Sequence, residues 1–105
     1  SESLSRVHDA LRSGLEALDP TQRDEAAVRQ VARSAGGDAR RVEVATHDGV
    51  IGIAVGDGDG TCIAGSVGPD GAVEVWTVPR VLAQPGEVGC SAEAAARGLG
   101  QRDPH

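Results

Sequence analysis

The sequence has almost no aromatic residues: a single tryptophan, Trp76, and no phenylalanine, tyrosine or methionine among its 105 residues. The hydrophobic core must therefore be built from valine, leucine, isoleucine and alanine, whose small side chains each bury little area. At this chain length such a core has little stability in reserve, so a covalent cross-link would be useful. The lack of aromatic rings also excludes a platform on which nucleic-acid bases could stack.

Positive charge and long apolar runs are scarce as well. The basic residues are all arginine, and they number ten against 16 acidic residues, which gives a net charge of −6. Phosphate backbones are bound by basic surfaces, so this balance argues against a nucleic-acid partner. No run approaches the roughly 18 apolar residues of a membrane-spanning helix. We therefore expect contact with a membrane only through an anchor absent from this chain.

Residues 1–37 show the periodicity of two amphipathic helices. The first should end at Asp19–Pro20, because the residue before a proline avoids the α region. The second should start near Thr21, with Asp24 three residues on as a weak capping box. It should stop at Gly36–Gly37, since glycine accepts the left-handed conformation. The apolar stripes that define the two helices are Leu4, Val7, Leu11, Leu15 and Leu18, then Val28, Val31, Ala32 and Ala35.

From Arg41 the pattern alternates, which predicts strands at 42–47, 50–55, 62–67 and 72–78. Asp48–Gly49 fits a two-residue type I′ turn, and residues 58–60 and 69–71 fit three-residue loops that end in a left-handed glycine. These turns fix the register, and the list of facing pairs is Val44 with Ile53, Val42 with Val55, Ile51 with Val67, Val55 with Ile63, and Val67 with Val73.

All three registers place the large aliphatic side chains on one face, which predicts a four-stranded antiparallel meander. The expected fold class is α+β: two N-terminal helices packed on the sheet, and an irregular C-terminal tail attached to the sheet by a disulfide. We expect one domain over residues 1–105, with a helical part at 1–37, a sheet at 41–78 and a tail at 79–105. Neither the helices nor the sheet could bury its apolar face alone.

The other face of the sheet combines Trp76 with small side chains. The register places Trp76 beside Ala64, which lies beside Ala54. Such a surface suits a covering segment, and the tail from Pro79 onward is the candidate, with a short helix at 91–99 capped by Ser91. The alternative is a solvated face in which Trp76 fills its own gap. The remaining residues on this face are Gly52, Cys62, Ser66 and Val78.

Cys62 and Cys90 are the only cysteines. Cys62 points to the face that the tail should cover and Cys90 lies in that tail, which favours a disulfide worth roughly 3–4 kcal/mol. Two free buried thiols or a redox pair are the alternatives, although the spacing is unlike C-x-x-C. A disulfide implies an oxidising compartment, so we expect an extracytoplasmic protein.

No pattern predicts an active site, a cofactor or a metal. Residues 57–61 resemble a calcium loop, but position 12 of that loop is Gly68 where an EF-hand carries glutamate, and a turn explains the same residues. The glycine-rich stretch lacks the lysine of a P-loop, and G-x-S-x-G is absent. The residues considered as ligands or nucleophiles and set aside are His8, His47, His105, Ser66 and Ser91.

The layout resembles the soluble part of type IV pilins and pseudopilins. The residues that carry the resemblance are the strand around 61–63, the glycine-rich turn before it, Pro85–Gly86, and Cys90 near the end. In that family the segment between such cysteines covers the sheet and makes contacts in the assembly. The long hydrophobic N-terminal helix of the family is not present in these residues, and the helical part breaks at Pro20. The arginine-only basic set is typical of GC-rich bacteria such as actinobacteria.

The sequence thus predicts a non-enzymatic extracytoplasmic binding or scaffolding domain, such as the soluble part of a membrane-anchored protein. We expect a protein partner, bound through the sheet edges or the tail, with Trp76 as a candidate contact. A small ligand is not expected, because few polar or aromatic groups could line a pocket. The alternative is a structural subunit of a pilus-like or secretion assembly.

Overall fold

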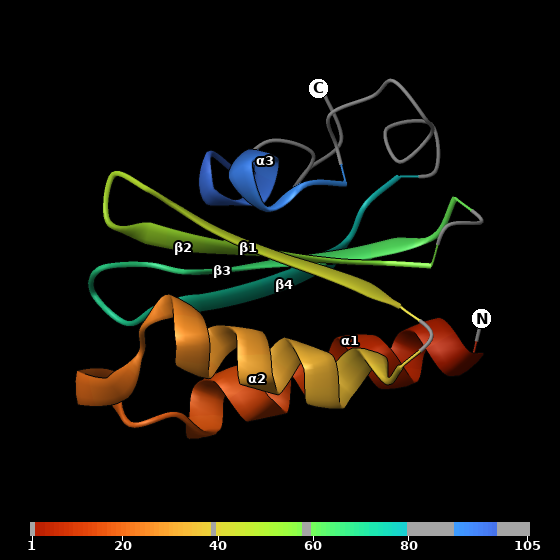
Figure 1. The fold of residues 1–105 in the computed structure, drawn as a ribbon, viewed down its shortest axis with the longest axis horizontal. Helices are drawn as coiled ribbons and strands as arrows, with labels where there is room; N and C mark the ends of the chain where they lie inside the picture. The colour runs from red at the N-terminus through yellow and green to blue at the C-terminus, as the bar shows by residue number, and fades with distance from the viewer. Residues whose placement is uncertain (1, 39, 58–59, 80–89, 99–105) are drawn as a thin grey trace.

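The protein forms three layers in the computed structural model, which describes residues 2–38, 40–57, 60–79 and 90–98. Helices α1 (Glu2–Ala17) and α2 (Glu25–Gly36) cover one face of the sheet, and α3 (Ala92–Ala96) lies on the other (Figure 1). The α+β class, the two helices and the disulfide-linked C-terminal region are therefore as predicted. The strands are β1 (Arg41–His47), β2 (Val50–Gly56), β3 (Cys62–Val67) and β4 (Val73–Thr77).

The second helix begins later than the sequence predicted. Asp24, not Thr21, is its N-cap, and the Asp24 carboxylate accepts from the backbone N–H of Ala27 at 2.8 Å. Thr21 belongs instead to a short 3-10 turn, η1 (Pro20–Gln22), where the Asp19 carboxylate accepts from the Thr21 N–H at 2.9 Å and from its hydroxyl. These bonds favour the ionised form and lower the pKa of Asp19. Asp19 therefore caps the 3-10 turn and Asp24 caps α2, whereas the sequence predicted a single helix that starts near Thr21.

The two long helices approach each other closely at Gly14. A β-carbon at this position would lie 2.5 Å from Cγ1 of Val31 on α2. Glycine in the middle of a helix costs about 1 kcal/mol relative to alanine. At residue 14 the glycine allows α1 and α2 to pack closely. A side chain there would meet Val31, so the two helices would have to move apart.

The sheet is a meander in the order β1-β2-β3-β4, and the strand pairing matches the prediction. Val44 pairs with Ile53, Ile51 with Val67, and Val67 with Val73. The tight turn has positive φ angles at both central residues, 51° at Asp48 and 79° at Gly49, as a type I′ hairpin requires. Gly60 and Gly71 also have positive φ, which confirms the two glycine-ended loops.

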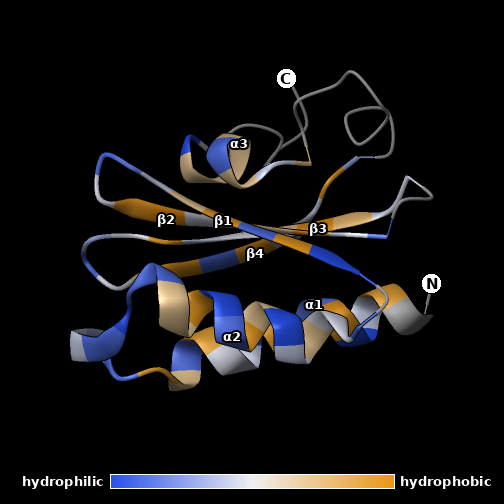
Figure 2. Cartoon of the chain, viewed as in Figure 1, coloured by the Kyte–Doolittle hydropathy of each residue, from blue (hydrophilic) through white to orange (hydrophobic). Residues whose placement is uncertain are grey.

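The main core lies between the sheet and the two long helices. It is entirely aliphatic, as the composition requires, and the apolar sides of α1 and α2 turn toward the strands (Figure 2). Leu11, Leu15 and Ile53 are among its largest fully buried side chains. Its buried members are Val7, Leu11, Leu15, Val28, Ala32, Ile51, Ile53, Val55, Ile63, Val67 and Val75.

Candidate functional site

A disulfide joins the sheet to the segment that leads into α3. Cys62 on β3 is fully buried and bonded to Cys90, with the two α-carbons 6.0 Å apart. The predicted pairing is therefore confirmed, and the alternative of two free thiols is wrong for this structure. Ser91 then caps α3 by accepting from the N–H of Ala94 at 3.1 Å. The Glu43 carboxylate on β1 accepts from the N–H of Ala92 at 3.3 Å, which fixes the start of α3 over the sheet.

Helix α3 lies directly on the backbone of β2 at Gly52. A β-carbon at Gly52 would lie 2.1 Å from the carbonyl oxygen of Ala92 and 2.4 Å from the nitrogen of Ala96. The buried side chains of α3 are all alanine, so the helix presents a thin, smooth face to the sheet. Small residues on both partners thus allow the two backbones to touch. The sequence predicted a small-residue face covered by the tail from Pro79 onward, and α3 is a described part of that tail.

Replacing Gly52 with alanine should dislodge α3, because the new methyl group would meet backbone atoms that cannot move independently. We expect a loss of about 1–3 kcal/mol in the free energy of unfolding, as for other overpacked sites. Gly56→Ala is the matched control on the same strand and face, since its β-carbon would meet only Sγ of Cys90, at 3.2 Å. Urea denaturation of both variants measures the difference, and equal losses would contradict direct contact between α3 and β2.

Trp76 lies in a second, smaller core under α3. Its side chain is only 8% exposed and packs with Ala54, Ala64 and Ala95. The alternative of a solvated face is therefore wrong. Within the described residues the cover is α3. The predicted cover by the tail at 79–90 falls mostly on residues 80–89, which lie outside the described residues. The other members of this cluster are Cys62, Val78 and Cys90.

A partner contact through Trp76 stays a prediction, and the burial limits its form. A partner could reach most of the indole ring only after α3 moved away. The indole Nε1 is buried, and the described residues provide no hydrogen-bond partner for it. A buried donor without an acceptor costs about 1–3 kcal/mol.

The structure describes four of the five histidines and serines weighed as ligands or nucleophiles. His8 Nε2 lies 3.2 Å from the carbonyl oxygen of Val75, and His47 lies 3.3 Å from the Asp48 carboxylate. Ser66 is buried in β3 and Ser91 caps α3. Among the residues that the structure describes, no three His, Cys, Asp or Glu side chains gather in a way that could hold a metal ion. His105 lies outside the described residues.

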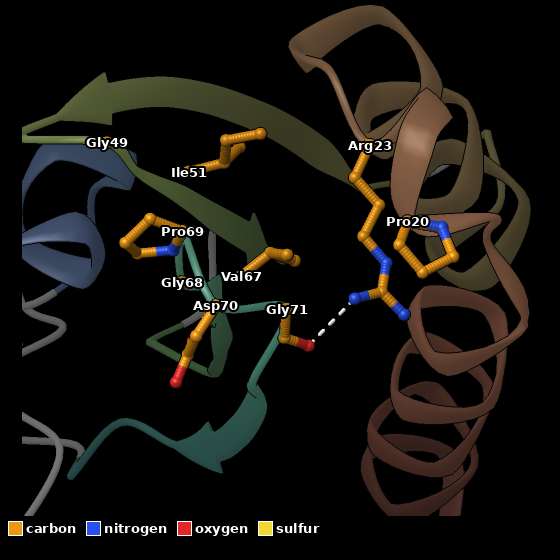
Figure 3. Close-up of a pocket in the computed structure, with 9 residues that line it drawn as sticks. All are labelled: Pro20, Arg23, Gly49, Ile51, Val67, Gly68, Pro69, Asp70 and Gly71. Carbon is orange, nitrogen blue, oxygen red and sulfur yellow. Dashed lines mark hydrogen bonds between the residues drawn. The ribbon is translucent and has the colours of Figure 1, made fainter.

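A hollow of about 210 Å³ lies where two hairpin turns meet the link between α1 and α2 (Figure 3). Arg23 reaches across it and donates from Nη1 to the carbonyl oxygen of Gly71 at 2.8 Å. The Asp70 carboxylate accepts from the N–H of Ala72 and is used in its own turn. Arg23 therefore ties the helical layer to the β3–β4 turn, a long-range contact that no local pattern predicted. The remaining lining residues are Pro20, Gly49, Ile51, Val67, Gly68 and Pro69.

The two edges of the sheet differ in how their backbone groups are satisfied. Along β4, Val75 has its carbonyl turned away from β3, and this carbonyl accepts from Arg12 at 3.3 Å and lies within hydrogen-bond distance of His8. Helix α1 thus covers the middle of the β4 edge. Pro79 follows directly after this strand region and has no N–H to donate. The β4 edge is therefore protected against pairing with another strand.

No described residue covers the β1 edge in this way. The N–H of Asp57, just after β2, donates to Thr61 on the β3 side, so odd-numbered residues of β2 bond to β3 and even-numbered ones bond to β1. The partners of the even-numbered residues are the odd-numbered residues of β1. Val42, Val44 and Thr46 therefore turn their backbone N–H and C=O groups outward. No described residue bonds to these groups.

Comparison of the chain with protein-family models, with curated proteins and with solved structures finds no match. Across the described ranges, none of the helices has the length and apolar character needed to cross a membrane. The fold defines a small disulfide-linked α+β domain in which the described residues cover the β4 edge of the sheet but not the β1 edge.

Proposed function

We propose that this chain is a non-enzymatic binding or scaffolding domain that works outside the cytoplasm, such as the soluble part of a membrane-anchored protein. The observation that carries this proposal is the Cys62–Cys90 disulfide, which joins the fully buried Cys62 on the sheet to the segment that leads into α3. Disulfides of this structural kind form and persist in oxidising compartments and are rare in the cytosol. The burial of Cys62 fits a structural bond, since catalytic cysteines need an exposed thiolate.

The binding role is supported by where the polar groups are used. Asp19, Asp24 and Ser91 cap helical segments, and His8 lies against the β4 edge. By contrast, no described residue bonds to the outward backbone groups of β1. An exposed row of backbone donors and acceptors is a standard docking surface for an extended segment of a protein. We therefore assign partner binding to the β1 edge.

Two experiments in the native cell test this proposal. The first measures the redox state of the two cysteines, and the second identifies the surface that contacts a partner. Cells are quenched in acid and treated with an alkylating reagent, and each fraction is analysed by mass spectrometry without reductant. We expect unmodified protein, two hydrogens lighter than the reduced form, outside the cytoplasm. Protein found in the cytoplasm with both thiols alkylated would overturn the proposal.

A photo-reactive residue in place of Arg41 on β1 should then form cross-links to protein in the same cells. The control position is Glu16, which is exposed on α1 away from that edge. Cross-links from residue 16 with none from residue 41 would contradict binding at β1.

A second candidate, a structural subunit of a pilus-like or secretion assembly, is favoured by one observation. An open, mainly apolar hollow of about 310 Å³ lies between α1 and α2, away from the β1 edge. A repeating assembly needs two different contact surfaces on each subunit. The hollow and the β1 edge would be two such surfaces. The hollow is lined by Ala10, Gly14, Gln30, Val31, Ser34 and Ala35.

A further inference from the structure

We propose that the partner of the β1 edge is β1 of a second copy of this chain, paired antiparallel across a two-fold axis. The two four-stranded sheets would then form one continuous antiparallel sheet. This inference rests on the proposed function, because it names the partner for the same surface. It starts from the outward-facing backbone groups of Val42, Val44 and Thr46, which are unbonded within the described residues.

The strand lacks most of the features that normally protect an exposed edge, although it carries two charged side chains, Arg41 and Glu43. Natural edge strands carry proline, lysine or a bulge, or are covered by another segment. Strand β1 contains neither proline nor lysine, and its pairing with β2 runs without a bulge from Arg41 to His47. With seven residues it is longer than β4, which has five and is covered at Val75. Among the described residues, β4 is covered at Val75 and β1 is not, so β1 is the edge better suited to a further strand.

Full overlap of the two copies matches the backbone groups. The middle residue of β1 is Val44, so an axis through it places Val44 opposite Val44 of the second copy. Val42 then faces Thr46 of the second copy, in both directions. Each of these pairs turns its free N–H and C=O toward the other strand and can exchange both backbone bonds. On the helix-facing side, Val44 meets Val44 of the second copy and Val42 meets its Thr46. Such β-branched pairs are favourable cross-strand neighbours.

The charges favour an antiparallel copy in this register. The strand begins at the exposed Arg41 and ends next to Asp48, whose carboxylate is exposed, whereas Arg40 before the strand is held within the chain by Asp57 and the Gly36 carbonyl. Antiparallel pairing brings the basic end of one copy beside the acidic end of the other. It also places Glu43 opposite Ala45 of the second copy. Moving the axis by one residue to Glu43 would place the two Glu43 carboxylates opposite each other, and directly opposed like charges are destabilising.

The experiment measures the mass of the whole oxidised chain by sedimentation equilibrium, from micromolar to millimolar concentration. We expect a transition from the monomer of 10.6 kDa to a dimer. The blocking variant is Thr46→Pro, because the N–H of Thr46 points outward and is not used in pairing with β2. It removes two symmetric backbone bonds and should raise the dissociation constant by about tenfold or more, at about 1 kcal/mol for each bond.

Thr46→Ala is the matched control. Both variants lose the hydroxyl bond from Thr46 to Glu25, but only the proline variant loses the outward N–H. Dimerisation that survives in Thr46→Ala and is lost in Thr46→Pro, with equal far-UV circular dichroism, supports the pairing. A dimer that Thr46→Pro leaves unchanged would overturn it, since the contact would then lie elsewhere.

Hydrogen exchange of the wild-type chain provides a test without any variant, and it decides the matter if Thr46→Pro does not fold. The amides of Val42, Val44 and Thr46 should become protected as the concentration rises, while that of Val73 on the β4 edge should not. A monomer at every concentration, with fast exchange at all three β1 amides, would overturn self-pairing. Cross-links from residue 41 to a different protein would in that case still support the proposed function, so the two failures are distinguishable.

Discussion

Replacing Ile53 with alanine should lower the free energy of unfolding by about 2–5 kcal/mol, the usual cost of truncating a large side chain in a packed core. Ile53 is fully buried on the central strand β2, between Val44 and Gly65 on the neighbouring strands. The core contains no aromatic ring or methionine that could shift into the space. Each isoleucine therefore carries a large share of the buried area, and urea denaturation will measure the loss.

Val50→Ala provides the control for this prediction. Val50 begins the same strand but is only partly buried, beside the tight turn. Its truncation should cost much less than that of Ile53. A loss below about 1 kcal/mol for Ile53→Ala would mean that the side chain does not fill the core.

Reduction of the disulfide should cost about 3–4 kcal/mol of stability, because the Cys62–Cys90 bond closes a loop with a sequence separation of 28. The loss should begin locally. Without the bond, α3 is held on the sheet mainly by small alanine contacts and by the Glu43 bond to Ala92. Trp76 is the only tryptophan, so the fluorescence of the chain reports on the second core under α3 alone. We expect a red shift and easier quenching after reduction, below the melting temperature and with unchanged far-UV signal.

Complete reduction must be confirmed by alkylation of both thiols in a parallel sample. The double variant Cys62→Ala/Cys90→Ala separates the loss of the bond from any effect of the reductant. It should show the same fluorescence change without treatment. If the reduced and oxidised chains unfold at the same urea concentration, the disulfide contributes nothing to the stability of the fold.

The sheet was predictable from the sequence because its register depends on local turn chemistry. The turns at Asp48–Gly49 and Gly71 each set the register of the two strands that they join. The alternation of apolar residues then indicates which side chains lie on each face of the sheet. The helix start was less predictable, since Asp19 and Asp24 both offer a cap and only the folded chain shows which carboxylate starts α2.

The features that depend on distant contacts could not be predicted in the same way. Gly52 resembles any other small residue until α3 is known to lie on it. Nor does any local pattern connect Arg23 to the Gly71 carbonyl. The candidate site shows the same division. The pairing of Cys62 with Cys90 followed from faces and chain reach, whereas the unequal protection of the two edges depends on where Arg12 lies in the folded protein.

The unequal burial of the two cysteines also decides which sulfur atom a reductant reaches first. Cys62 is fully buried, whereas Cys90 is only partly buried. A thiolate attacks along the line of the two sulfur atoms, so attack at Sγ of Cys62 requires α3 to separate from the sheet, and Sγ of Cys90 is the more accessible target. The first mixed disulfide should therefore form on Cys90, with Cys62 released as the thiol. The bond that holds the C-terminal segment on the sheet is thus opened from the side of that segment, while the sheet keeps its own cysteine inside the core.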